Sequence, residues 1–231
     1  MASQHVYTDV ETSLAAIIPA GSVFEIRLLG ANRKRVDAGF FNHPSEAASA
    51  IAALDNHYQG IYLTPNPVNP DLLARSQNRI QPYAQYTTMD GDVLKRSWLL
   101  VDVDPKRPAG ISSTDEQHQA ALAKARQISA MLNFQYGWCL PMLNSSGNGA
   151  HLMYPINEAN DEITRDTIAR FLKLLNARFG DTVCDCDTTP FNAARIWRVP
   201  GTWARKGDST TERPHRKATI LQPIRHLSTI T

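Results

Sequence analysis

Two aspartates separated by one residue, Asp102 and Asp104, are the side chains of this sequence best suited to chemistry. They follow the apolar run 98–101, and Pro105 comes next, so the pattern predicts a buried strand that ends in two acids. Residues two apart in a strand point to the same side. Neighbouring carboxylates repel unless a cation or proton lies between them, and a hard divalent ion is the usual partner. An ordinary strand end with acidic loop residues is the alternative.

A glycine-rich turn is the second candidate for chemistry. Residues 146–149 read Ser-Gly-Asn-Gly, and His151 follows at the start of a predicted strand. Glycine lets the backbone approach a ligand closely, and a nest of N–H groups beside an imidazole suits a phosphate. A plain hairpin turn with a hydrogen-bonded histidine is the alternative, because this sequence is a good turn in itself.

A second pair of alternating acids, Asp185 and Asp187, lies in the predicted strand 183–187. A third carboxylate beside Asp102 and Asp104 would complete a two-metal site for in-line phosphoryl or nucleotidyl transfer. The residue types and the spacing leave both acids of this pair as candidates.

Basic residues are concentrated downstream of these acids. The chain has a net charge of +2, but residues 195–217 carry seven Lys or Arg against two acids, a net +5, so the rest sums to −3. A basic patch on a slightly acidic body indicates a phosphate-binding surface. A solvated loop is the alternative for most of these charges. The seven are Arg195, Arg198, Arg205, Lys206, Arg213, Arg216 and Lys217.

The composition fits a globular chain in a reducing compartment. The 231 residues, 42% of them hydrophobic, suit one large domain or two packed lobes. Three cysteines are too few for a disulfide framework, and Cys184 and Cys186 lack a second pair, so we expect no zinc site and a cytoplasmic location. No apolar stretch approaches membrane length and the first residues do not resemble a signal peptide, so we expect no membrane partner.

The predicted order of elements from residue 98 onward is strand, helix, strand, strand, helix, strand. This is the split βαβ, ferredoxin-like pattern of the α+β class, which RNA-recognition modules share. Its first and third strands lie side by side, so Asp102 and His151 should be neighbours. The predicted elements are strand 98–104, helix 115–133 capped by Thr114, strands 138–143 and 150–156, helix 162–179 and strand 183–187.

Upstream, the sequence predicts a smaller α/β lobe. Strand 22–29 has a hairpin partner around 39–41, Ser45 can cap a helix through residue 54, and 60–63 is a short strand. The polar residues of the following loop, including Asn66, are expected to be solvated. We therefore expect an N-terminal α/β lobe over residues 1–95, packed against an RRM-like catalytic lobe over residues 96–231.

Taken in order, these motifs resemble the archaeo-eukaryotic primase superfamily, in its bacterial, phage and plasmid primase-polymerase branch. The family has an apolar strand ending in Asp-x-Asp, here 99–104, then a small-residue turn ending in His, here 146–151. An apolar residue followed by Asp comes next, here best matched by Cys186 and Asp187. Segments 191–195, 200–207 and 213–216 are similar to the family's Asp…Arg…Gly-Thr…Lys continuation, so the resemblance covers most of the chain.

The sequence departs from the family pattern at two positions. Many members have Ser where this chain has Gly149, and Val or Ile usually stands where it has Cys186. The second departure leaves Asp185 as a competitor of Asp187. We favour Asp187 because of its position relative to the segment 192–195.

The resemblance implies template-dependent nucleotidyl transfer by a DNA primase-polymerase, in primer synthesis or extension during replication or repair. Asp102, Asp104 and Asp187 would bind two Mg²⁺ or Mn²⁺ ions, which help deprotonate the attacking hydroxyl and neutralise the triphosphate and leaving pyrophosphate. The implied partners are a single-stranded DNA template, a primer strand and nucleoside triphosphates, with a helicase domain or protein as a further candidate.

The resemblance also implies roles for the turn and the basic segment. The triphosphate would be held by the turn, its histidine and two downstream cations, namely Ser146, Gly147, Asn148, Gly149, His151, Arg195 and Lys206. The nucleic-acid backbone would contact Arg198, Arg213, Arg216 and Lys217.

Two other functions use the same kind of sheet. A replication-initiator nuclease would need a His-x-His metal pair, and the sequence has none. A non-catalytic RRM-like module would bind nucleic acid without metal and would not need the three acids. The sequence does not choose between ribo- and deoxynucleotides.

Overall fold

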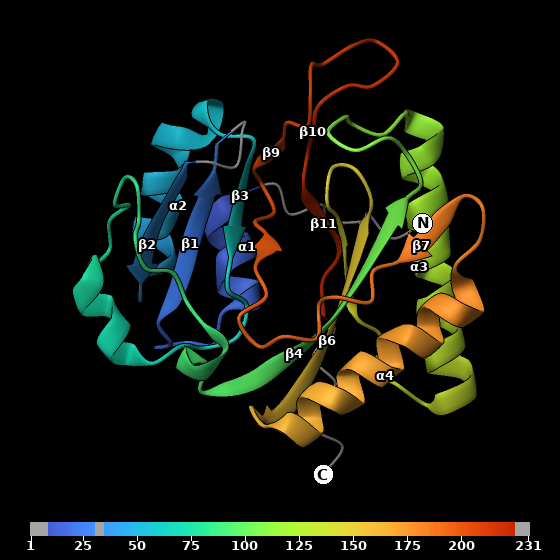
Figure 1. The fold of residues 1–231 in the computed structure, drawn as a ribbon, viewed down its shortest axis with the longest axis horizontal. Helices are drawn as coiled ribbons and strands as arrows, with labels where there is room; N and C mark the ends of the chain where they lie inside the picture. Colours follow the sequence, from blue (N-terminus) through green and yellow to red (C-terminus); the bar gives the residue numbers. More distant parts are fainter. Residues whose placement is uncertain (1–8, 31–34, 225–231) are drawn as a thin grey trace.

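A computed structural model describes residues 9–30 and 35–224. Two larger antiparallel sheets lie side by side, and the segment that contains β9 (Trp203–Ala204) runs between them (Figure 1). Helices α1 and α2 lie with the N-terminal sheet, while α3 and α4 cover the outer face of the other sheet (Figure 1). The α+β class predicted from the sequence is confirmed.

The N-terminal sheet has the strand order β2-β1-β3-β8. The predicted hairpin is confirmed, because β1 pairs with β2 in antiparallel register. Helix α2 begins at Pro44, and the predicted cap by Ser45 is wrong: His43 occupies the N-cap without a side-chain bond, and the proline at the first position suits a helix start. The elements are α1 (Val10–Ile17), β1 (Phe24–Leu29), β2 (Val36–Phe41), α2 (Pro44–Leu54), η1 (Asp55–His57) and β3 (Gly60–Leu63).

The larger sheet has the order β11-β5-β6-β4-β7. Its β4, α3, β5, β6, α4 and β7 form the predicted split βαβ arrangement with β4 and β6 in the middle, and β11 extends the edge beyond β5. Thr114 caps α3 as expected, in a capping box with Gln117. The elements are β4 (Lys95–Pro105), α3 (Asp115–Tyr136), β5 (Met142–Ser145), β6 (Ala150–Ala159), α4 (Glu162–Phe179), β7 (Cys184–Cys186) and β11 (Thr219–Gln222).

The register of β4 explains why acids appear at its end. Trp98 and Leu100 belong to the core shared with the N-terminal sheet, whereas Val101 and Val103 pack with α3 and α4. Because side chains alternate along a strand, Asp102 and its successor Asp104 continue the face that points toward the N-terminal sheet. The apolar interface between the two sheets therefore ends in a pair of carboxylates.

The C-terminal half of the chain also contributes to the N-terminal sheet. Strand β8 (Trp197–Arg198) pairs with β3 through Leu63 and Tyr62, and β9 (Trp203–Ala204) pairs with β10 (Arg216–Lys217). This crossing carries part of the basic segment to the wall opposite the carboxylates. The lobe boundary at residue 95 stays a prediction.

The connection between β3 and β4 contains two short 3-10 turns, η2 (Pro70–Arg75) and η3 (Asp90–Asp92). Asn66 is buried here rather than solvated, which corrects the expectation. Its side chain accepts from the N–H groups of Ser97 and Trp98 and donates to the Ala193 carbonyl. Within residues 9–30 and 35–224, no helix has the length and apolarity needed to cross a membrane.

Candidate active site

Three strand ends bring the predicted acids together on one face of the larger sheet. Asp102 lies opposite His151 of β6, and Asp104 lies opposite Asp185 of β7. The N–H of Asp187 donates a 2.8 Å bond to the Asp102 carbonyl. Opposite residues of antiparallel strands point to the same side, so all four carboxylates share the face toward the N-terminal sheet.

Asp102 has the most buried side chain of the four acids. Its Oδ1 atom is buried and has no hydrogen-bond partner within the described part of the chain. Burial raises the pKa of Asp102 well above its usual range, and the charges of Asp104 and Asp187 add to the shift, while Arg195 and Lys206 oppose it. Such a carboxylate is stabilised by a proton or by a bound cation.

The other three acids each face a basic side chain. Asp104 lies 3.5 Å from the guanidinium of Arg107, and the two remaining pairs are shorter. They are Asp185 with Lys106 at 3.2 Å and Asp187 with Arg195 at 3.0 Å. Each acid is therefore neutralised locally by a cation of the protein.

As these side chains stand, no three His, Cys, Asp or Glu groups of residues 9–30 and 35–224 converge closely enough to hold a metal ion. The donor chemistry nevertheless fits Mg²⁺ or Mn²⁺, which prefer carboxylate oxygens, and the Asp102 Oδ1 atom lacks a partner. An ion would have to compete with Arg107 and Arg195 for Asp104 and Asp187.

His151 stands beside Asp102 as a neutral imidazole. Its Nε2 atom lies 3.6 Å from the Asp102 Oδ1 atom, and its ring packs on Trp197 with 3.9 Å between centroids. Burial lowers the pKa of His151 to about 3, with smaller contributions from the positive charges of Arg198, Arg195 and Lys206. The contact with Asp102 is therefore no ion pair near neutral pH, and the ring can donate one hydrogen bond to a ligand.

The glycine turn between β5 and β6 has a hydrogen bond within itself and packs closely against the backbone of β4. The Ser146 hydroxyl accepts from the Gly149 N–H at 2.9 Å, and Gly147 adopts a left-handed conformation with φ of 88°. A Cβ on Gly149 would lie 2.4 Å from the Val103 carbonyl oxygen. Neither serine nor any other side chain fits at this position unless the backbone moves.

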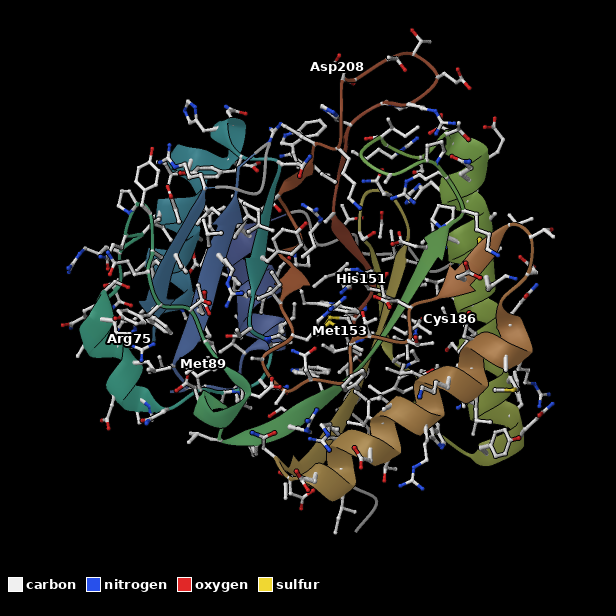
Figure 2. All side chains as sticks on the ribbon, viewed as in Figure 1. Arg75, Met89, His151, Met153, Cys186 and Asp208 are labelled. Carbon is white, nitrogen blue, oxygen red and sulfur yellow. The ribbon has the colours of Figure 1, made fainter. Side chains whose placement is uncertain are left out.

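A cavity of 270 Å³ opens between these groups and the N-terminal sheet. Figure 2 shows His151 near the middle of the molecule, where the two sheets meet. Seven of the predicted site residues for metal or nucleotide line the cavity, namely Asp102, Asp104, Ser146, Asn148, His151, Arg195 and Lys206. The opposite wall comes from residues that sequence reasoning missed: Leu29, Tyr62, Ile196 and Trp197.

Arg198 is buried and lines this wall of the cavity. Its guanidinium lies 4.6 Å from the centre of the Tyr62 ring and donates a 2.6 Å bond to the Tyr62 hydroxyl. Gly60 makes the room, because a Cβ there would lie 2.4 Å from the Arg198 Nη1 atom. No local sequence pattern predicts that Tyr62 lines the cavity, because its position there depends on the pairing of β3 with β8.

Three further residues of the basic segment, Arg213, Arg216 and Lys217, do not line the catalytic cavity. Arg213 donates to the Ser112 carbonyl at 2.9 Å, and Arg216 donates to the Ser113 carbonyl at 2.9 Å and to Asp115 at 2.7 Å. Both therefore brace the loop before α3. Lys217 is exposed. The predicted contact of these three residues with nucleic acid stays a prediction.

Comparison with known proteins yields similarity of fold alone. No family model matches the sequence, and no curated protein matches it. The crystal structure of primase RepB' aligns with 94% of this chain, at 12% identity and a TM-score of 0.48. The aligned part is 55% of the RepB' chain, so this chain spans only about half of the length of that protein. The polymerase domain of Mycobacterium tuberculosis ligase D in complex with DNA aligns with 91% of this chain and 79% of its own, at 13% identity and a TM-score of 0.49.

Proposed function

We propose that this chain is a DNA primase-polymerase of the archaeo-eukaryotic primase superfamily, in the bacterial, phage and plasmid branch, and that it transfers nucleotides to a primer on a single-stranded template. One observation carries the proposal: the buried Asp102 carboxylate, with Oδ1 unpartnered among the described residues, lies beside Asp104 and Asp187 at the floor of a cavity lined by cations. Burying a charge without a partner is costly, so we infer that this cluster serves a bound cation.

Asp102, Asp104 and Asp187 would hold two Mg²⁺ or Mn²⁺ ions. When bound, the ions would lower the pKa of the attacking hydroxyl and neutralise the charge that develops on the phosphates. The carboxylates of Asp104 and Asp187 would first separate from Arg107 and Arg195.

The cavity supplies the contacts that a nucleoside triphosphate needs. The neutral His151 ring can donate a hydrogen bond to a phosphate oxygen, and Arg195 and Lys206 bring positive charge to the same space. Trp197, on the wall formed by β8, offers an apolar surface next to the histidine.

The two competing functions lack a matching feature. A non-catalytic RNA-binding module gains nothing from a buried, unpartnered carboxylate. A replication-initiator nuclease needs a His-x-His pair, which the sequence lacks. The wider proposal includes a template strand, a primer, nucleoside triphosphates and a cytoplasmic location, with a helicase as a further partner.

A divalent-ion titration separates the three functions. A labelled primer on single-stranded DNA is incubated with nucleotides while Mg²⁺ or Mn²⁺ is varied. A primase-polymerase extends the primer only with the ion, a nuclease shortens the template, and a binding module retains the DNA equally well with or without the ion. A chain that leaves the primer unchanged at every ion concentration contradicts the proposal.

A further inference from the structure

A groove of 650 Å³ opens between α3 and α4, and its lining residues come from these two helices and the turn after α3. Figure 1 shows both helices on the outer face of the larger sheet. They pack on that sheet through Val101 and Val103, whereas Asp102 and Asp104 alternate with these valines and point the other way. A ligand in this α3–α4 groove would therefore leave the carboxylates uncovered.

An aromatic stack lines the groove, and the end of α3 holds it in place. Gly137 ends α3 in a left-handed conformation with φ of 69°. The chain then turns back, so that the Trp138 N–H donates to the Leu132 carbonyl at 3.1 Å. The Asn133 side chain donates to the Trp138 carbonyl at 2.7 Å, and the Trp138 ring stacks on Phe171 of α4 with 5.2 Å between centroids. The stack is therefore fixed before any partner arrives, which lowers the entropic cost of binding.

Two large apolar side chains that line the groove are exposed to solvent. Leu174 of α4 is 70% exposed, and Tyr136 of α3 is 59% exposed. The larger sheet does not cover Leu174, because α4 packs on it through Ile168, Leu172 and Leu175. Single exposed apolar residues are ordinary, but exposed apolar residues that continue into a groove are typical of a binding surface.

The helix segments beside the groove carry charge of one sign. Residues 117–136 of α3 and 167–179 of α4 contain no acid. They contain five cations, which are Lys124, Arg126, Arg170, Lys173 and Arg178. Lys124 pairs with Asp181, whereas the other four form no ion pair within the described residues. Arg178 itself lines the groove. An acidic partner would therefore be attracted to this face, and a basic partner would be repelled.

Other occupants fit these features less well. A twofold dimer through this face would place the cations of one copy opposite the same cations of the other, because such an interface joins identical patches. A nucleic-acid backbone needs several cations along its path, and Arg178 is the only charged residue among the described residues that line the groove. An added strand needs an exposed sheet edge, and no strand contributes a lining residue within the described chain.

We infer that the α3–α4 groove is a docking site for a partner protein, which places an acidic amphipathic helix there. Apolar side chains of that helix, spaced i, i+3 or i+4 and i+7, would pack on Trp138, Phe171 and Leu174, and its carboxylates would face Arg178. The inference goes beyond the proposed function, since it concerns the face of the larger sheet that points away from the catalytic cavity.

The test begins with a display library of random peptides of about 16 residues, which is long enough for four helical turns. The library is selected on the full wild-type chain and counter-selected on Leu174→Glu, which should fold because this side chain is exposed. We expect the recovered peptides to carry net negative charge and apolar residues at helical spacing. Recovery of no peptide, or of neutral or basic peptides, overturns the inference.

The recovered acidic peptide is then synthesised with a fluorescent label, and its affinity is measured by anisotropy. Leu174→Ala should weaken binding at least about tenfold, the scale of one buried leucine. Leu94→Ala is the matched control, because Leu94 is also exposed, at 59%, and does not line the groove. Equal affinity of Leu174→Ala and wild type overturns the inference.

A charge reversal tests the electrostatic part of the inference. Arg178→Glu should weaken binding of the acidic peptide about fivefold, the scale of exposed charge contacts, and strengthen binding of a peptide in which Lys replaces each acid. Arg79→Glu, an exposed change on the N-terminal lobe, is the matched control. Unchanged affinities of Arg178→Glu for both peptides overturn the inference.

Two further measurements distinguish the other occupants. Sedimentation of the wild-type chain as a dimer that Leu174→Glu converts to a monomer would assign the groove to a second copy. Flotation with phosphatidylglycerol vesicles that Leu174→Glu abolishes would assign it to a membrane surface. Either result overturns the inference. Peptide binding is measured without nucleotide or metal, so its outcome does not depend on the proposed function, which the primer-extension assay tests separately.

Discussion

The main-chain N–H of Asp187, just after β7, donates a 2.8 Å hydrogen bond to the main-chain carbonyl of Asp102 in β4, although the two residues are far apart in the sequence. This bond holds Asp187 beside Asp102, and the negative charge of Asp187 is one of the causes that raise the pKa of Asp102, after burial and the charge of Asp104. Asp185 lies opposite Asp104 and faces Lys106 instead. The role of Asp187 as the third ligand stays a prediction, with Asp185 as its competitor.

Asp187→Asn should reduce single-nucleotide incorporation by at least about a hundredfold, since it removes both charge and a ligand from a site that stabilises the transition state. Asp185→Asn, two residues earlier in β7, is the matched control and should stay within a few-fold of wild type. Both rates are measured under single-turnover conditions in Mn²⁺. Loss of activity in Asp185→Asn with activity retained in Asp187→Asn would move the third ligand to Asp185.

His151→Ala should raise the KM for nucleotide about tenfold and leave the affinity for single-stranded DNA nearly unchanged. The physical reason is the loss of a neutral hydrogen-bond donor at the wall of the catalytic cavity, next to Trp197. Steady-state kinetics and a DNA titration measure the two effects. A variant with wild-type nucleotide KM and rate would show that His151 only packs against the tryptophan.

Gly149→Ser should destabilise the fold by about 1–3 kcal/mol, the usual cost of overpacking, because its Cβ would lie 2.4 Å from the Val103 carbonyl oxygen. Gly91→Ser is the control, since a Cβ on Gly91 meets nothing within 4 Å. Urea unfolding gives both free energies of unfolding. Equal stability of the two variants would mean that the turn can move away from β4.

Stability should fall between pH 6.5 and pH 4 because of His118. Its Nε2 atom lies 2.8 Å from the Ser145 hydroxyl. Burial, with help from the charge of Arg216 and against that of Asp115, lowers its pKa to about 4. The unfolded chain binds a proton near pH 6.5 and the folded chain does not, so acidification stabilises the unfolded state by up to about 3 kcal/mol.

His118→Gln removes this proton uptake, so the free energy of unfolding of the variant should vary less with pH over that interval than that of wild type. Chemical unfolding at a series of pH values provides the comparison. Parallel pH curves for the two proteins would show that His118 titrates alike in both states.

Lys217→Ala should make the salt dependence of DNA binding shallower by about 0.7 in the log–log slope, the value for one phosphate contact on a single strand. The loss should be the same for every DNA sequence, since backbone contacts carry no sequence information. Arg213→Ala and Arg216→Ala are measured in the same salt series. If Arg213→Ala and Arg216→Ala leave the slope unchanged but lower the melting temperature, the two arginines stabilise the loop before α3 and do not contact DNA.

The sequence predicts the order of elements in the split βαβ sheet because most of their patterns are local, although the strand predicted over 138–143 lies at Met142–Ser145. Thr114 signals the start of α3, and the alternation at Asp102 and Asp104 indicates which side the acids share. That Asp102 and His151 lie next to each other follows from the strand order of the split βαβ sheet, in which their two strands are adjacent.

What the sequence does not predict depends on contacts between distant segments. β8 has only two residues and forms by pairing with β3, so neither its existence nor the placement of Tyr62 and Arg198 in the cavity has a local pattern. The burial of Asn66 has no local pattern either. Its side-chain amide forms hydrogen bonds with three backbone groups that belong to two other segments. Arg107 follows the acids directly, yet its burial depends on how the loop closes.

The most direct test of the central claim compares the wild-type chain with Asp102→Asn in single-turnover primer extension, with Mn²⁺ and a single-stranded template. Asparagine has the same shape but no charge and one oxygen fewer, so the variant should stay folded and bind DNA as wild type does. We predict that wild type adds nucleotides only with the ion and that Asp102→Asn adds none. Extension by Asp102→Asn at the wild-type rate, or its absence in wild type with both ribo- and deoxynucleotides, would contradict the two-metal function.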